Sequence, residues 1–375
     1  MKLCVFPNDP ILSYFQKGEI KERYFNPLNF FDEIHVISLF DEEIDEEKVK
    51  IIAGKANLKI HRLGKANLKN YKKFEPIVTE LIKKIQPSLI RAFNPLVQGW
   101  LATIASKKLK IPLIISLHTN YDEQREFLKK KRNYFRYLKL LYTSKKLEKF
   151  SLQKANAIIC VYKSIVPYAK KMGAKNIHVI YNKVDLRQFS KSHEKKLIFD
   201  NPIIISVGQL IEHKPRQNLI KAIKDLEVIL VIIGDGPDFD SLNTLTKSLK
   251  IQNKVKFIRN VPNNDLPGYY SSCDIFALPL EISYGIPIPV LEAMSCGLPI
   301  VISKHSENYS EIIDNSVLFV DNNPESFKTA FQKILSDQEF ADKLLRKSLS
   351  FVREINGDIM EKKELELYKQ LMKNN

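Results

Sequence analysis

Short apolar runs alternate with longer amphipathic stretches through the first half of the chain. The apolar runs predict strands at 2–6, 33–40, 58–63, 88–92, 112–118, 157–161 and 177–181. Between these runs, the segments 74–85, 95–109 and 123–153 have the apolar spacing of helices. Alternation of strands and helices is typical of a parallel sheet that is covered by helices on both faces.

The same pattern begins again after a polar, charged segment at 185–198. Nearly continuous apolar runs predict strands at 202–208, 228–234, 255–258, 274–279, 298–303 and 317–320. We therefore expect an N-terminal domain at 1–190, a second domain at 191–357, and a helix at 358–375 that returns to the N-terminal domain. Two doubly wound sheets that face each other across a cleft would bind ligands beyond the carboxyl ends of their strands.

Length and composition agree with two globular domains, because 375 residues with 44% hydrophobic side chains can bury two cores. The sequence has no apolar run of about 18 residues that would predict a transmembrane helix. We read no secretory signal at the N-terminus, and the four cysteines are far apart, as expected for free thiols in a reducing compartment. These features predict a cytoplasmic protein.

The net charge of +16 predicts an attraction to polyanions. Nucleic acid, anionic lipid headgroups and phosphorylated substrates all meet that description. The sign of the charge does not choose among them, and a lysine-rich coding bias would give the same total.

The segment VGQLIEHK (207–214) is the first candidate for chemistry. A strand ends at Gly208 and a helix follows from about 216, so a ligand could approach the bare backbone and the first amides of the helix. Lys214 adds a full positive charge, and together these features suit a diphosphate. By itself, a glycine and a lysine in a loop more often have no functional role.

A second candidate is Glu292, within SYGIPIPVLEAMSCGLPIVIS (283–303). A loop that contains Gly285 leads into the helix that bears Glu292, and Gly297-Leu298-Pro299 ends this helix before the next strand. A carboxylate in that position can accept hydrogen bonds from two vicinal hydroxyls of a ribose. The alternative is an exposed glutamate that only complements the helix dipole.

Taken together, these segments resemble the donor domain of glycosyltransferase family 4, whose members are retaining enzymes of GT-B fold. The motifs that carry the resemblance are VGQLIEHK (207–214), VIIGDGPD (231–238), VKFIRNVPNNDLPGYYSSCDIFALP (255–279), YGIPIPVLEAMSCGLPIV (284–301) and SEIIDNSVLFV (310–320). In the N-terminal half the likeness is looser, and SLHTNYDEQR (116–125), ANAIICV (155–161) and VIYNKVDLRQF (179–189) carry it. The fold implied is α/β, with two Rossmann-like doubly wound parallel-sheet domains.

The resemblance implies transfer of a sugar from a nucleoside diphosphate sugar to a hydroxyl of a glycan or a lipid-linked glycan, with retention and with neither metal nor cofactor. Lys214 matches the residue that neutralises the diphosphate, Glu292 the residue that holds the ribose, and His118 the histidine near the reacting sugar. The remaining donor-binding positions implied are Gly208, Gln209, Arg259, Asn260, Val261, Tyr284, Gly285, Ile286 and Pro287.

The sequence departs from the family pattern at Pro215, where a glycine is usual, in lacking the N-terminal Gly-Gly loop, and at two positions of the donor site. Tyr284 stands where the first glutamate of the signature pair belongs, eight positions before Glu292, and Glu281 is the nearest carboxylate that could replace it. Gln209 stands where an arginine is usual, which removes one positive charge near the diphosphate. A catalytically inactive protein that binds nucleotide sugars is therefore an alternative.

The Asp-x-Asp triplet Asp238-Phe239-Asp240 matches a metal-binding pattern, but it follows GDGP at the expected start of a helix. Acidic residues in a first turn complement the helix dipole. We therefore predict no metal site.

The basic stretch 127–154 is the last candidate, with Lys129, Lys130, Lys131 and Arg132 at its start. Phe127, Tyr134, Leu138 and Leu141 have helical spacing, so the stretch predicts one amphipathic helix that could lie on an anionic membrane surface. A solvated helix that packs on its own domain is the competing interpretation, and a basic nucleic-acid-binding protein is the least favoured one.

Overall fold

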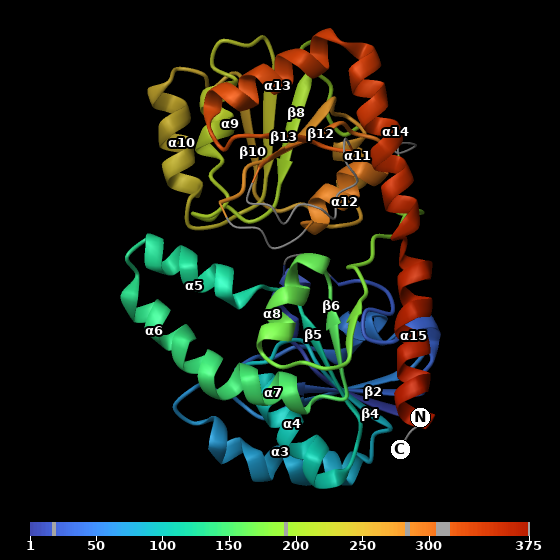
Figure 1. The fold of residues 1–375 in the computed structure, drawn as a ribbon. Coiled ribbons are helices and arrows are strands. Elements are labelled where there is room, and N and C mark those ends of the chain that lie inside the picture. Colours follow the sequence, from blue (N-terminus) through green and yellow to red (C-terminus); the bar gives the residue numbers. More distant parts are fainter. Residues whose placement is uncertain (17–19, 191–193, 282–285, 305–315, 374–375) are drawn as a thin grey trace. The chain divides into compact units, whose positions relative to one another are not determined.

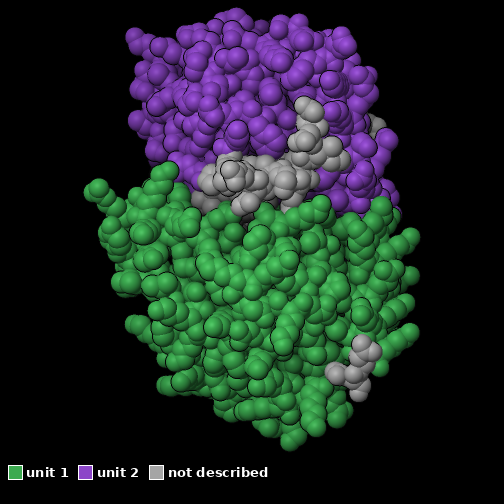
Figure 2. All heavy atoms as spheres, viewed as in Figure 1, with its two compact units in different colours: residues 1–181, 358–375 green, residues 182–357 purple. Residues whose placement is uncertain are grey.

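The computed structural model describes residues 1–16, 20–190, 194–281, 286–304 and 316–373. The chain forms two compact units, coloured separately in Figure 2. Unit 1 consists of Met1–Tyr181 together with Asp358–Asn375, and unit 2 consists of Asn182–Gly357. The polar segment that follows Tyr181 therefore belongs to unit 2.

Unit 1 is built on a parallel sheet of seven strands in the order β3-β2-β1-β4-β5-β6-β7. The strands are β1 (Lys2–Phe6), β2 (Glu33–Ser38), β3 (Asn57–Arg62), β4 (Leu89–Ala92), β5 (Leu113–Leu117), β6 (Ala157–Cys160) and β7 (Ile177–Val179). Each one lies within or beside a predicted apolar run. Strands β4, β5 and β6 are buried along their whole length, as the central strands of a doubly wound sheet must be.

Helices cover this sheet (Figure 1). They include α1 (Ile11–Gln16), α2 (Glu46–Val49), α3 (Tyr71–Ile85), α4 (Val97–Leu109), α8 (Val166–Lys171) and the C-terminal α15 (Gly357–Lys373). Helix α15 is attached through the buried Arg91 of β4, which donates hydrogen bonds to Glu364 and to the hydroxyl of Tyr368. The amide of Leu28 also donates to Glu361, at 2.8 Å.

The stretch predicted as one long helix is instead two helical segments. The first is α5 (Tyr121–Lys130), and the second runs from α6 (Tyr134–Thr143) through a π-helical turn at Ser144–Glu148 into α7 (Lys149–Lys154). Arg132 adopts a φ of 56°, which reverses the chain, and the side chain of Asn133 then caps α6. Phe127 consequently lies on a different helix from Tyr134, so the prediction of one continuous apolar face was wrong.

Unit 2 contains a parallel sheet of six strands in the order β10-β9-β8-β11-β12-β13. The strands are β8 (Ile203–Val207), β9 (Ile229–Ile233), β10 (Val255–Ile258), β11 (Ile275–Leu278), β12 (Ile300–Ser303) and β13 (Leu318–Val320). Among its described residues, the α-helices are α9 (Gln217–Ala222), α10 (Phe239–Ser248), α11 (Leu266–Tyr270), α12 (Ile288–Ser295), α13 (Pro324–Ser336) and α14 (Gln338–Glu354). Both sheets are therefore doubly wound, and the predicted α/β architecture is confirmed.

No helix in the described ranges is both long enough and apolar enough to cross a membrane.

Candidate functional site

The candidate site of unit 2 lies where the order of its strands reverses. Strand β8 pairs with β9 on one side and with β11 on the other, so the loops after β8 and β11 start at this switch point. The amide of Glu281, after β11, donates to the carbonyl of His213, after β8, at 2.8 Å. Open parallel sheets bind ligands beyond the carboxyl ends of strands at such a point.

Two glycines after β9 let the loop after β8 approach closely. A Cβ atom on Gly234 would lie 2.2 Å from the carbonyl oxygen of Gly208, and one on Gly236 would lie 2.2 Å from that of Leu210. The amide of Leu210 donates to the carbonyl of Asp235 at 2.9 Å, which fastens the two loops. The glycines of the GDG triplet therefore serve the packing of one loop on another.

Two cationic side chains lie beside the bare backbone of Gly208. A Cβ atom at this glycine would stand 3.5 Å from Nη2 of Arg216 and 3.8 Å from Nζ of Lys214. The sequence pattern pointed to Lys214 but not to Arg216. The only signal was a second basic residue two positions further on, and nothing in the sequence showed that its side chain turns inward to be 1% exposed.

Burial of Arg216, opposed by the charge of Asp238, lowers the pKa of its guanidinium to about 9, so it stays protonated at neutral pH. The neighbouring His213 responds to the same charges. Its burial, together with Lys214 and Arg216, lowers the pKa of its imidazole to about 4, so the ring is neutral. The loop is thus a positively charged region that favours an anion.

The first turn of α9 offers fewer free backbone amides to an anion than the sequence predicted. This helix has six residues, and the amides of Asn218 and Leu219 already donate to the carbonyls of Pro215 and Arg216, at 3.0 Å each. These two amides are therefore not free to bind phosphates. Positive charge at this loop comes from side chains.

Glu292 is on α12 and is only 3% exposed, which rules out the alternative of an exposed dipole-complementing glutamate. Its Oε2 accepts a hydrogen bond from the hydroxyl of Tyr270 at 3.0 Å, and its Oε1 accepts one from Nδ2 of Asn263 at 3.3 Å. Asn263 is itself held by Nε2 of Gln188, at 2.9 Å from its Oδ1. This chain of hydrogen bonds fixes the direction of the carboxylate.

The other predicted donor-binding residues lie around these loops. Arg259 is exposed, pairs with Asp235 at 2.9 Å and stacks over the ring of Phe239 at 4.5 Å. The structure places Gln209 and Asn260 in exposed positions, Val261 in a half-buried one, Ile286 in a buried one and Pro287 at the N-cap of α12. Tyr284 and Gly285 lie outside the described residues.

The Asp238-Phe239-Asp240 triplet begins a helix, as predicted. Asp238 is the N-cap residue of α10, and Asp240 lies in its first turn. Both carboxylates are thus positioned to complement the helix dipole.

In unit 1, His118 follows β5 at the carboxyl edge of the sheet. Its ring stacks on Phe93 with centroids 5.6 Å apart, and the guanidinium of Arg91 lies 4.4 Å from the centre of the Phe93 ring. Burial, together with the charge of Arg91, lowers the pKa of His118 to about 4. Its Nε2 is buried and has no hydrogen-bond partner in the described part of the chain. His118 is thus a neutral group with a free hydrogen-bonding position.

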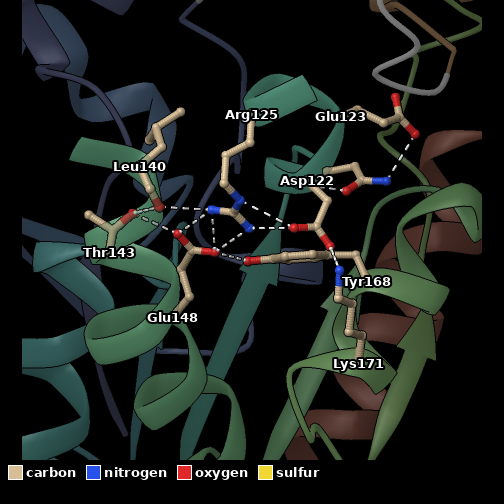
Figure 3. A network of polar contacts seen from close by, with 9 residues as sticks. Asp122, Glu123, Arg125, Leu140, Thr143, Glu148, Tyr168 and Lys171 are labelled. Carbon is tan, nitrogen blue, oxygen red and sulfur yellow. Dashed lines mark hydrogen bonds and ion pairs between the residues drawn. The ribbon is translucent and has the colours of Figure 1, made fainter. Parts of the chain in front are cut away.

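A buried polar network holds the base of the α5–α6 hairpin (Figure 3). Arg125 of α5 donates to both oxygens of Glu148, at 3.0 and 3.1 Å, and to Asp122 at 2.8 Å. Thr143 and Tyr168 also donate to Glu148, which is 0% exposed. The sequence showed Glu148 only as the single acid of a basic stretch. In the structure it anchors that stretch.

Basic and apolar side chains share the exposed end of this hairpin. Lys129, Lys130, Lys131 and Arg132 are all exposed at the turn between α5 and α6. On α6, Tyr134, Leu138 and Phe135 are exposed, Phe135 by 83%. Leu138 lies three residues after Phe135 and four after Tyr134, so its side chain neighbours both of theirs on the helix surface. We call these seven residues the hairpin patch.

Comparison with known proteins gives a consistent result along the chain. The family model "Glycosyltransferase Family 4" matches residues 32–188, and the model "Glycosyl transferases group 1" matches residues 188–349. One similar curated protein is the GDP-mannose-dependent alpha-(1-6)-phosphatidylinositol monomannoside mannosyltransferase of Mycolicibacterium smegmatis, 27% identical over 33% of this chain and 36% of its own length. The alignments with three of the curated relatives span 36%, 41% and 61% of those proteins.

Solved structures of similar fold cover the whole chain. Sucrose-phosphate synthase from Thermosynechococcus elongatus superposes with a TM-score of 0.77 at 15% identity, over 100% of both chains. HepE of Anabaena, solved in complex with UDP and glucose, superposes with a TM-score of 0.74 at 15% identity, over 99% of this chain and 100% of its own. At this identity the likeness concerns the fold, and the two parallel-sheet units form a GT-B fold.

Proposed function

Because the chain belongs to the family 4 glycosyltransferases, with both halves matched by glycosyltransferase models, we propose that it moves a sugar from a nucleoside diphosphate sugar to a hydroxyl of a glycan or lipid-linked glycan. We further propose that transfer retains the anomeric configuration and requires neither metal nor cofactor. The observation that carries the proposal is the site at the switch point of unit 2, where a cationic loop and the buried, oriented carboxylate of Glu292 follow neighbouring strands.

The two parts of this site suit the two ends of a nucleoside diphosphate. Lys214 would neutralise the charge that grows on the diphosphate as the bond from the anomeric carbon to the phosphate oxygen breaks. Glu292, fixed by Tyr270 and Asn263, would accept hydrogen bonds from the ribose hydroxyls. Arg259, with Asn260 and Val261, would border the base.

The acceptor oxygen forms the new bond to the anomeric carbon on the face that the diphosphate leaves. Its proton passes to the departing phosphate oxygen, so no carboxylate base is needed. His118 would use its free Nε2 to hydrogen-bond the donor sugar. A neutral ring suits that role, because a cation beside the anomeric carbon would oppose the positive charge that develops there.

A panel of donors tests this function directly. Purified protein is mixed with UDP- and GDP-sugars, and its melting temperature is recorded, because a ligand that binds only the native state stabilises it. The donor that binds is then incubated with glycan and lipid-linked acceptors, and the anomeric configuration of the product is read by NMR. Binding with neither transfer nor hydrolysis would instead favour the inactive nucleotide-sugar-binding protein. No binding by any donor would refute the proposal.

We also propose that the hairpin patch docks the protein on an anionic membrane surface, which suits a lipid-linked acceptor. Exposed aromatic and leucine side chains beside four basic residues are the two components of interfacial binding. Each basic residue contributes about 1 kcal/mol near an anionic surface, so four of them would give reversible attachment that salt weakens.

Co-sedimentation with vesicles tests the docking. Wild-type protein is expected to pellet with anionic vesicles at low salt and to remain in solution with neutral ones. Replacing Lys129, Lys130, Lys131 and Arg132 by Gln should abolish pelleting. A matched control replaces Lys83, Lys84, Lys362 and Lys363, which are exposed elsewhere on unit 1, and removes the same charge. Equal loss in both variants, or no pelleting of the wild type, would contradict a specific docking surface.

A further inference from the structure

We propose that Arg216 supplies the second positive charge for the donor diphosphate, in place of the arginine that Gln209 replaces. The inference rests on the proposed function, since it concerns the same donor site. Arg216 lies outside the VGQLIEHK motif (207–214) that carries the family resemblance.

The surroundings of Arg216 are those of a cation without its anion. The residue is 1% exposed, yet its guanidinium forms no ion pair with any carboxylate in the part of the chain that the structure describes. Nη1 and Nη2 donate to the carbonyls of Lys214 at 3.2 Å and Val207 at 3.3 Å, and Nε has no partner among the described atoms. Burial of a guanidinium is costly unless an anion compensates it. Two carbonyl groups, together with the charge of Asp238, which forms no ion pair with Arg216, supply only partial compensation.

The position of the guanidinium indicates which anion is missing. Nη2 of Arg216 and Nζ of Lys214 lie 3.5 and 3.8 Å from the point where a side chain at Gly208 would begin. Gly208 follows β8 at the switch point of the sheet, and its φ of 130° belongs to the region that favours glycine. A diphosphate at this backbone would therefore meet two cations, and it carries at least two negative charges.

A purely structural role is the alternative. In that case Arg216 would only pin the loop through the carbonyls of Val207 and Lys214. The two roles differ in what they predict for ligands. Loop pinning would affect the nucleoside and the nucleoside diphosphate alike, whereas charge supply concerns only the ligand that carries phosphates.

Calorimetry with matched ligands separates these roles. The variants are Arg216→Met and Arg216→Lys, with Arg346→Met on the exposed surface of α14 as a control that removes the same charge. For Arg216→Met we expect the Kd for the nucleoside diphosphate to rise about tenfold or more, as for loss of a hydrogen bond to a charged group. Arg216→Lys should stay within about threefold of the wild type, and uridine or guanosine binding should not change. Equal losses for nucleoside and diphosphate, or no loss for Arg216→Met, would overturn the proposal.

A measurement on the wild-type protein does not depend on whether the methionine variant folds. The Nε–H resonance of Arg216 is assigned by its absence from the spectrum of Arg216→Lys. It should move downfield when diphosphate is added and stay in place with the nucleoside, because the proton gains an anionic acceptor. No movement at saturation would refute the proposal. Inorganic pyrophosphate is the second probe: if it binds through Arg216 while no nucleotide binds, the proposed function fails and this inference stands.

Discussion

Removal of the Glu148 carboxylate should destabilise unit 1 more than any exposed substitution. Glu148 is 0% exposed and accepts hydrogen bonds from Arg125, Thr143 and Tyr168. In Glu148→Ala, the guanidinium of Arg125 keeps only its contacts with Asp122 at 2.8 Å and with the carbonyl of Leu140 at 3.0 Å. Breaking a buried ion pair costs about 3–5 kcal/mol. Because Asp122 still compensates part of the charge, we expect a loss of about 3 kcal/mol, at the lower end of that range.

Calorimetry and hydrogen exchange together check this value. For a unit of this size, about 3 kcal/mol corresponds to a fall in melting temperature of roughly 6–12 °C. Exchange should increase first in peptides from α6 and α7, because the network holds the base of the hairpin. Glu126→Ala removes an exposed carboxylate from the same helix, α5, and should stay within about 0.5 kcal/mol of the wild type.

A double variant then separates the destabilisation caused by an unpaired buried charge from the net stabilisation by the Arg125–Glu148 pair. Arg125→Met combined with Glu148→Leu removes both charges and keeps apolar volume. It should be more stable than Glu148→Ala, since the uncompensated guanidinium is gone. If Glu148→Ala lies within about 1 kcal/mol of the wild type, the network does not hold the hairpin and the reasoning from burial is refuted.

Three further predictions follow from the two units. Glu292→Gln should weaken calorimetric binding of the nucleoside diphosphate by about 1.5 kcal/mol or more. The control Glu339→Gln, on the exposed start of α14, should leave the affinity unchanged. Equal affinities of the two variants would exclude the proposed binding of the ribose by Glu292. Transfer should persist in excess chelator, and loss that manganese or magnesium restores would show a metal requirement. Stability should fall as the pH drops from about 6.5 towards 4, because burial lowers the pKa values of His118 and His213 and the unfolded chain therefore binds protons that the folded chain does not. A plot of the urea midpoint against pH over this range should have a smaller slope in His118→Gln and His213→Gln than in the wild type. An unchanged slope would contradict the lowered pKa values of these histidines.

Sequence pattern alone determined the architecture. The strands of both units were predictable because a parallel strand buried on both faces must be nearly continuous in apolar residues, as in 202–208 and 228–234. The helix that carries Glu292, and its end before Gly297, were predictable for the same local reason: glycine and proline interrupt helices in any context.

The local backbone conformation and the burial of individual side chains could be learned only from the tertiary structure. The break between α5 and α6 occurs at Arg132 in a left-handed conformation, which no glycine or proline announced. Two arginines in different basic segments also differ in a way that composition does not reveal. Arg216 turns inward against Gly208, whereas Arg132 faces solvent, and Glu148 becomes an internal anchor. Burial depends on which distant segments pack over a residue, and that is decided by the whole fold. The sequence therefore indicated the candidate loops, and only the packed structure showed which charged side chains lie inside them.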